Sequence, residues 1–81
     1  MLTNGSCLIW NVRGLNDRAR RNVLSTLVQL HCSSLLCLQE TKLAVVSVAL
    51  ATECLGQAFD FTVLPAVGTA GGVLLAWLRD T

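Results

Sequence analysis

Two polar side chains, each placed directly after a short apolar run, are the strongest candidates for chemistry in this sequence. Asn11 follows the run Cys7–Trp10, and Glu40 follows the run Leu35–Gln39. In open α/β sheets, ligands bind at the carboxyl ends of the strands, which is where these residues would lie. A carboxylate suits Mg²⁺, which takes oxygen ligands and keeps several waters, and an amide can orient a phosphate or a neighbouring ligand. On spacing alone, a solvated glutamate at the end of a strand is the simpler interpretation.

Three other features could carry chemistry, and each has a structural explanation. His31 has a cysteine beside it, but adjacent helical positions do not face each other, so the two do not form a catalytic pair. Gly68–Gly72 lacks the lysine that follows a phosphate-binding loop and precedes an apolar run, which favours a hairpin turn. Arg18, Arg20 and Arg21 could contact a phosphate backbone, although such a run usually marks a solvated helix face.

The elements that must position these residues follow from the spacing of apolar positions. Short apolar runs predict four strands, and a helical period with a capping residue or a terminal glycine predicts two helices. The first strand is expected from Ser6 to Asn11 or Val12, and the others over Leu35–Leu38, Phe59–Leu64 and Val73–Leu78. The helices are expected from Asp17 onward and over Leu43–Leu55. The resulting order, βαβαββ, predicts an α/β fold whose first two strands are parallel, since a helical crossover joins them.

Composition limits the class of protein. The 81 residues carry a net charge of +1, with 14% charged and 53% hydrophobic residues, which excludes a disordered tail and a strong field for nucleic acid or anionic lipid. The N-terminus does not resemble a secretory signal, and no stretch supplies the ~20 mainly apolar residues of a spanning helix. The sequence therefore predicts one small intracellular domain, not associated with a membrane.

Three segments resemble a known family. Leu8–Asn16 (LIWNVRGLN), Cys37–Leu43 (CLQETKL) and Thr69–Trp77 (TAGGVLLAW) are similar, in order and spacing, to the opening motifs of the endonuclease/exonuclease/phosphatase superfamily. The closest similarity is to the endonuclease domain of plant non-LTR retrotransposons, the LINE-type elements. The joint presence of WNVRGLN and LQETK at this separation is far more specific than either motif alone.

The resemblance implies a four-layer α/β sandwich like that of deoxyribonuclease I and Mg²⁺-dependent cleavage of phosphodiester bonds in DNA, which would place the protein in the nucleus. By motif, Asn11 belongs to the floor of the active site and Glu40 is the metal ligand. Lys42 follows the ligand in the family's ETK sequence, with a role that the motif does not define. Arg13 stands where many repair-type relatives carry an acidic residue.

The resemblance extends over nearly the whole chain but reaches only the first motifs of the family. Relatives carry further catalytic groups, in Asp-x-Asn and Ser-Asp-His segments, and these 81 residues contain neither. Residues 1–81 are therefore predicted to be the N-terminal fragment of a retroelement-type endonuclease domain, inactive alone. One alternative is a small interaction or complementation module that pairs with another chain through an exposed sheet edge. A nucleic-acid-binding domain that uses the three helix arginines is a further alternative, which the net charge disfavours.

Overall fold

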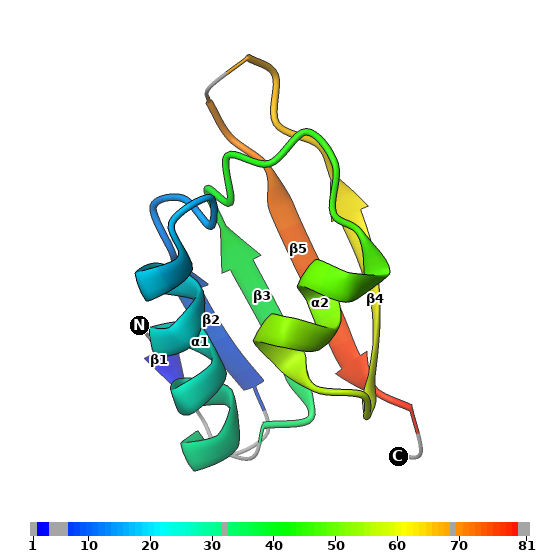
Figure 1. Ribbon diagram of the computed structural model, residues 1–81. Coiled ribbons are helices and arrows are strands. Elements are labelled where there is room, and N and C mark those ends of the chain that lie inside the picture. Colours follow the sequence, from blue (N-terminus) through cyan, green and yellow to red (C-terminus); the bar gives the residue numbers. More distant parts are fainter. Residues whose placement is uncertain (1, 4–6, 32, 69, 80–81) are drawn as a thin grey trace.

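The computed structural model describes residues 2–3, 7–31, 33–68 and 70–79, which form a single sheet with two helices. The strands are β1 (Leu2–Thr3), β2 (Cys7–Asn11), β3 (Leu35–Gln39), β4 (Phe59–Leu64) and β5 (Val73–Leu78), and the helices are α1 (Arg18–His31) and α2 (Val48–Leu55). The strands lie side by side in the order β1-β2-β3-β5-β4, and both helices cover the same face (Figure 1).

The topology confirms the predicted α/β fold. Strands β2 and β3 are parallel and are joined through α1, whereas β5 runs antiparallel to both β3 and β4. The structure adds β1, which pairs antiparallel with β2 and was not predicted. A strand of two residues is too short to produce an alternating pattern in the sequence.

Helix α1 begins after Asp17, whose Oδ1 accepts a hydrogen bond from the backbone N–H of Ala19 at 2.9 Å. This bond satisfies one of the free N–H groups of the first turn, as the sequence predicted for a capping residue there. Leu24 and Val28 are the buried residues of the helix and face the sheet. Helix α1 therefore covers the parallel pair of strands that it connects.

The predicted start of the second helix was wrong. Helix α2 begins at Val48 rather than Leu43, because Ser47 is its N-cap and accepts a hydrogen bond from the N–H of Leu50 at 3.0 Å. Leu43 instead lies in the connection from β3, where it is buried and its carbonyl accepts from the N–H of Ala66 at 2.9 Å. In the described part of the chain, no helix is long and apolar enough to cross a membrane.

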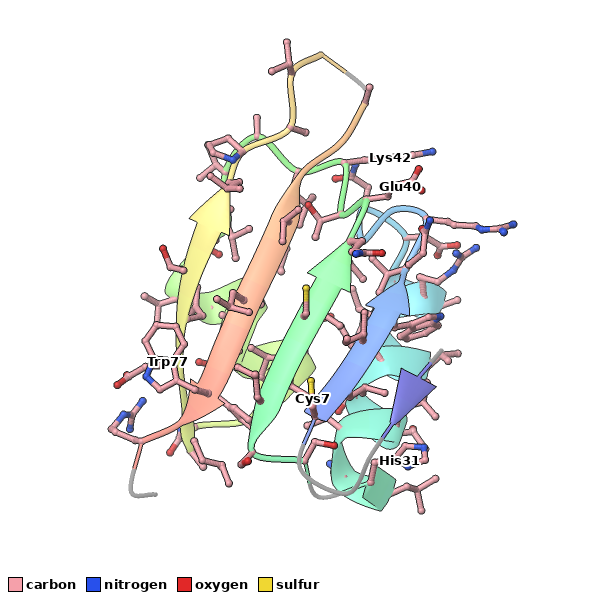
Figure 2. All side chains as sticks on the ribbon, turned by 180° about the vertical axis from the view of Figure 1, so that it is seen from behind. Cys7, His31, Glu40, Lys42 and Trp77 are labelled. Atoms are coloured by element: carbon pink, nitrogen blue, oxygen red, sulfur yellow. The ribbon has the colours of Figure 1, made fainter. Side chains whose placement is uncertain are left out.

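The core lies between the helices and one face of the sheet, and the opposite face is bare (Figure 2). Alternate strand residues point to opposite faces, so the neighbours of the buried Leu8, Leu36 and Leu74 point away from the helices. We call this second surface the open face. Its apolar members are Cys7, Ile9, Leu35, Cys37, Leu64, Val73, Leu75 and Trp77. The described residues thus form one sheet layer and one helix layer of the expected four.

Candidate functional site

Asn11 and Glu40 lie together at the carboxyl ends of the parallel strands. Asn11 is in register with Gln39 at the end of β3, so Glu40 begins the next stretch of chain beside it. The Asn11 side-chain Nδ2 donates to Glu40 Oε2, and Asn11 Oδ1 accepts from the N–H of Arg13 at 3.2 Å. The second oxygen of Glu40 has no hydrogen-bond partner among the described residues. The site therefore offers one oriented carboxylate with an oxygen left for a ligand.

The backbone that carries Glu40 is held from both sides. On the β2 side, the N–H groups of Gly14 and Leu15 donate to the carbonyls of Glu40 and Thr41 at 2.7 and 2.9 Å. On the β5 side, the N–H of Thr41 donates to the Gly72 carbonyl at 3.0 Å, and that of Lys42 donates to residue 71 at 2.8 Å. These bonds bring together the three segments that resemble the family motifs. Glu40 is consequently fixed by two loops that are distant in sequence.

Three non-glycine residues in the described chain have positive φ angles, and all three lie at this site. The angles are 55° for Arg13, 54° for Glu40 and 58° for Lys42. An L-residue in the left-handed region costs roughly 1–2 kcal/mol, so the backbone hydrogen bonds around Glu40 must stabilise an unfavourable conformation. Strain of this kind clusters at active sites and ligand clamps, where the surrounding structure determines the backbone.

Thr41 is a buried polar residue that the sequence reasoning missed. It is fully buried, and its Oγ1 accepts from the N–H of Leu43 at 3.3 Å. Gly72 packs so closely against it that a Cβ added to this glycine would approach Thr41 Oγ1 closer than 3.0 Å. The only signal in the sequence was a glycine pair before an apolar run, which predicted a turn but not its contact with residue 41.

Two arginines of α1 form hydrogen bonds with backbone carbonyls of the preceding loop. Arg20 Nη1 donates to the Val12 carbonyl at 2.6 Å, and Arg21 Nη1 donates to the carbonyls of Leu15 and Asn16 at 2.9 Å. Arg21 Nε also lies 2.7 Å from Glu53 Oε2, and this hydrogen bond is the main cause that raises the pKa of Arg21. These two side chains secure the loop that follows Asn11.

Of the three helix arginines, Arg18 alone has no described partner, so the structure gives no support to a phosphate-binding arginine cluster on α1. The exposed cations at the site are instead Lys42 and Arg13, which lie in the loops that carry Glu40 and Asn11. Lys42 extends from the same end of the sheet as Glu40 (Figure 2).

Glu40 has few candidate co-ligands. Within the described residues, no three histidine, cysteine or acidic side chains gather into a group that could hold a metal ion. His31 lies at the opposite end of the molecule from Glu40 (Figure 2). One carboxylate oxygen beside exposed, solvated positions suits a hard cation that keeps most of its waters, such as Mg²⁺. The donor set thus fits part of a magnesium site.

Comparison with known proteins gives a likeness among solved structures. No protein-family profile and no curated protein matches the sequence. Among solved structures, the chain is similar to the AP endonuclease LMAP from Leishmania major, with 29% identity and a TM-score of 0.73 over 93% of this chain. The chain spans only 24% of that structure's length. The likeness supports a nuclease-like domain with the deoxyribonuclease-I-like fold of the endonuclease/exonuclease/phosphatase superfamily.

Proposed function

We propose that this chain carries the Mg²⁺-binding part of an active site that hydrolyses phosphodiester bonds in DNA. The observation that carries the proposal is the hydrogen bond from the Asn11 amide to the Glu40 carboxylate, at the strained carboxyl ends of two parallel strands. In this role Glu40 is the metal ligand, and Asn11 is the residue that holds its carboxylate in place. The similarity to an AP endonuclease supports the reaction class.

The residues around Glu40 suit an anionic substrate. Because Asn11 donates to one carboxylate oxygen, the other is directed to a ligand without a rotation of the side chain. The exposed side chains of Arg13 and Lys42 add two positive charges beside this position, where a phosphate would lie. A bound Mg²⁺ would supply Lewis acidity to the phosphate and a water of lowered pKa.

The resemblance of WNVRGLN and LQETK supports a finer proposal, in which the chain derives from a plant LINE-type retrotransposon endonuclease whose substrate is nuclear DNA. The described residues provide one carboxylate at the site and no histidine there. Groups that act together in catalysis lose nearly all activity when members are removed. We therefore propose that the 81-residue chain binds the cation weakly and does not cleave DNA by itself.

Mn²⁺ titration followed by NMR tests the site directly, since this ion takes similar oxygen ligands and broadens nearby signals. We expect selective broadening at residues 11–14 and 39–42, and its loss in Glu40→Gln. Glu53→Gln is the matched control, because Glu53 is an exposed glutamate that pairs with Arg21 on the helices. Broadening that survives Glu40→Gln, or that is lost equally in Glu53→Gln, would contradict the proposal.

A nicking assay on supercoiled plasmid tests the second part of the proposal. We expect no nicking by the 81-residue chain in Mg²⁺, whether or not Glu40 is changed. Nicking by the unmodified chain that disappears in Glu40→Gln would show that the described residues suffice for catalysis.

A second candidate function is an interaction or complementation module. The observation that favours it is the open face, where Ile9, Leu35 and Trp77 are each 37–39% exposed and Leu64 is 69% exposed. A contiguous apolar surface of this kind is typical of protein contacts. A partner that supplies a second sheet would cover it, and this role is compatible with the proposed cation site.

A further inference from the structure

Strand β4 is an edge of the sheet, and its outer backbone groups are unpaired by another strand in the described chain. The N–H of Arg79 donates to the Ala58 carbonyl at 2.9 Å, which fixes which residues of β4 bond to β5. In an antiparallel ladder such residues alternate, so Asp60, Thr62 and Leu64 bond inward. The residues between them, 59, 61 and 63, direct their N–H and C=O groups outward.

This edge lacks the usual protection against pairing. Edge strands are normally prevented from pairing with other chains by a lysine, a proline, a bulge or a short length. Strand β4 has the sequence FDFTVL and keeps an unbroken register with β5 over six residue pairs. Its one charged side chain, Asp60, forms an ion pair with Arg79 at 2.9 Å. Arg79 also donates to the Phe59 carbonyl at 3.0 Å, which leaves the groups of Phe61 and Val63 as the uncovered part of the edge.

A hollow of about 670 Å³ lies beside the same edge, lined mainly by α2 and β4 and also by the turn between them, Trp77 and Arg79. On the helix side it is lined by Val48, Ala51 and Leu55, and Val48 is 74% exposed. On the strand side it is lined by Phe59 and Phe61, which are half-buried. Unpaired backbone groups and partly exposed apolar side chains thus lie along the same edge of the sheet.

We propose that β4 pairs antiparallel with β4 of a second copy of this chain, about a two-fold axis at Phe61. In this register Phe61 faces its own counterpart, and Phe59 faces Val63. The Phe59 carbonyl, which has two lone pairs, then accepts from the Val63 N–H of the second copy in addition to Arg79. Asp60 then lies opposite Thr62 of the second copy, a pair that places a hydroxyl near a carboxylate. The interface is self-complementary, as a two-fold contact requires.

The neighbouring registers are less favourable. Shifting the axis to residue 60 places two Asp60 carboxylates opposite each other, and like charges in that position are destabilising. Shifting it to residue 62 pairs Phe59 with Pro65, which has no N–H to donate. The axis at Phe61 is perpendicular to the sheet, so both copies of α2 lie on the same face. Each α2 then borders the other's hollow, and the two exposed Val48 side chains can be covered.

Two variants that carry opposite charges at residue 62 test the register of the proposed dimer. Thr62 is exposed and bonds inward to β5, so its side chain can change without loss of the core. Thr62→Asp places a carboxylate opposite Asp60 twice, because of the symmetry, whereas the matched control Thr62→Lys places an ammonium there. From cross-strand pair energies, we expect Thr62→Asp to weaken dimerisation about tenfold or more relative to Thr62→Lys. Sedimentation velocity over a concentration series measures this.

Hydrogen exchange distinguishes edge pairing from contact through the open face. In the dimer, the amides of Phe61 and Val63 should exchange slowly, and Thr62→Asp should make them fast. The Thr62-position amide, which bonds to β5, should stay protected in every variant. A chain that stays monomeric at all concentrations would overturn the proposal. So would association in which the Phe61 and Val63 amides exchange fast, or equal association of Thr62→Asp and Thr62→Lys.

Discussion

Replacing Gly72 by alanine tests whether the contact between the β5 loop and Thr41 positions Glu40. A Cβ at residue 72 would approach Thr41 Oγ1 closer than 3.0 Å, and Thr41 is fully buried. A rotation of the threonine about χ1 would relieve the contact but would break the bond from the N–H of Leu43. The alternative is a movement of the Gly72 loop, which would weaken its hydrogen bond to the Thr41 N–H.

The destabilisation caused by this contact can be measured by comparing Gly72→Ala with a matched variant, Gly71→Ala. Gly71 and Gly72 have φ angles of +76° and +91°, so alanine is strained at both positions, but a Cβ at Gly71 would meet no atom within 4 Å. Both variants carry the strain of a positive φ angle, and the difference between them reports the contacts of the new Cβ, of which that with Thr41 Oγ1 is the shortest. Overpacking of a well-filled site costs typically about 1–3 kcal/mol. Since about 1 kcal/mol lowers Tm by roughly 4–8 °C in a domain of this size, Gly72→Ala should melt roughly 4–24 °C below Gly71→Ala.

Thermal unfolding followed by circular dichroism gives the Tm difference, and the Mn²⁺ titration reports the site. We expect Gly72→Ala to reduce broadening at residues 39–42 below that of Gly71→Ala, because the backbone of Glu40 is then less well held. Equal Tm values for the two variants, or a lower Tm for Gly71→Ala, would refute the view that the loop clamps Thr41.

Four more outcomes follow from the side chains of Cys54, Arg21 and Asn11. Burial raises the pKa of Cys54 to about 11 from 9.0, so its thiol should resist alkylation at pH 8 while the half-buried thiols of the open face react. Because folding holds this proton more tightly, the stability it contributes is complete below pH 9 and is lost as pH rises towards 11, which urea unfolding at several pH values can measure. Arg21→Gln should lower the free energy of unfolding measurably through its lost carbonyl bonds, whereas Arg18→Gln, at a side chain without a described partner, should leave it nearly unchanged. Asn11→Asp should destabilise the metal-free chain in the same assay, because two carboxylates then meet at Glu40, and should tighten Mn²⁺ binding.

Much of the sheet could be predicted because its strands are short apolar runs with clear ends. The predicted bounds Phe59–Leu64 and Val73–Leu78 are those observed for β4 and β5. The proximity of Asn11 and Glu40 was predictable for a further reason. A crossover long enough for a helix favours parallel neighbours, and parallel neighbours end at the same edge.

The rest could not be predicted because it depends on contacts between segments that are distant in sequence. The stretch Leu43–Val46 has a helical pattern, but the Leu43 carbonyl accepts a hydrogen bond from the N–H of Ala66 instead of from a helical turn. The helix begins only after its N-cap, Ser47. Thr41 lies in a polar run that predicts exposure, yet it is buried because Gly72 packs on it. The roles of Arg20 and Arg21 depend likewise on carbonyls of the loop after β2.

The open face and the proposed cation site share one residue, Asn11. Asn11 ends β2, and its side chain lies on the open face in alternation with Cys7 and Ile9. A second layer packed on Ile9 would bury apolar area worth about 25 cal/mol per Å² and would hold the end of β2 against movement. The Asn11 amide would then hold the Glu40 carboxylate more tightly, at a site where positive φ angles make the observed backbone conformation unfavourable by itself. Covering the open face should therefore raise the cation affinity of Glu40 even if the covering layer contributes no ligand of its own.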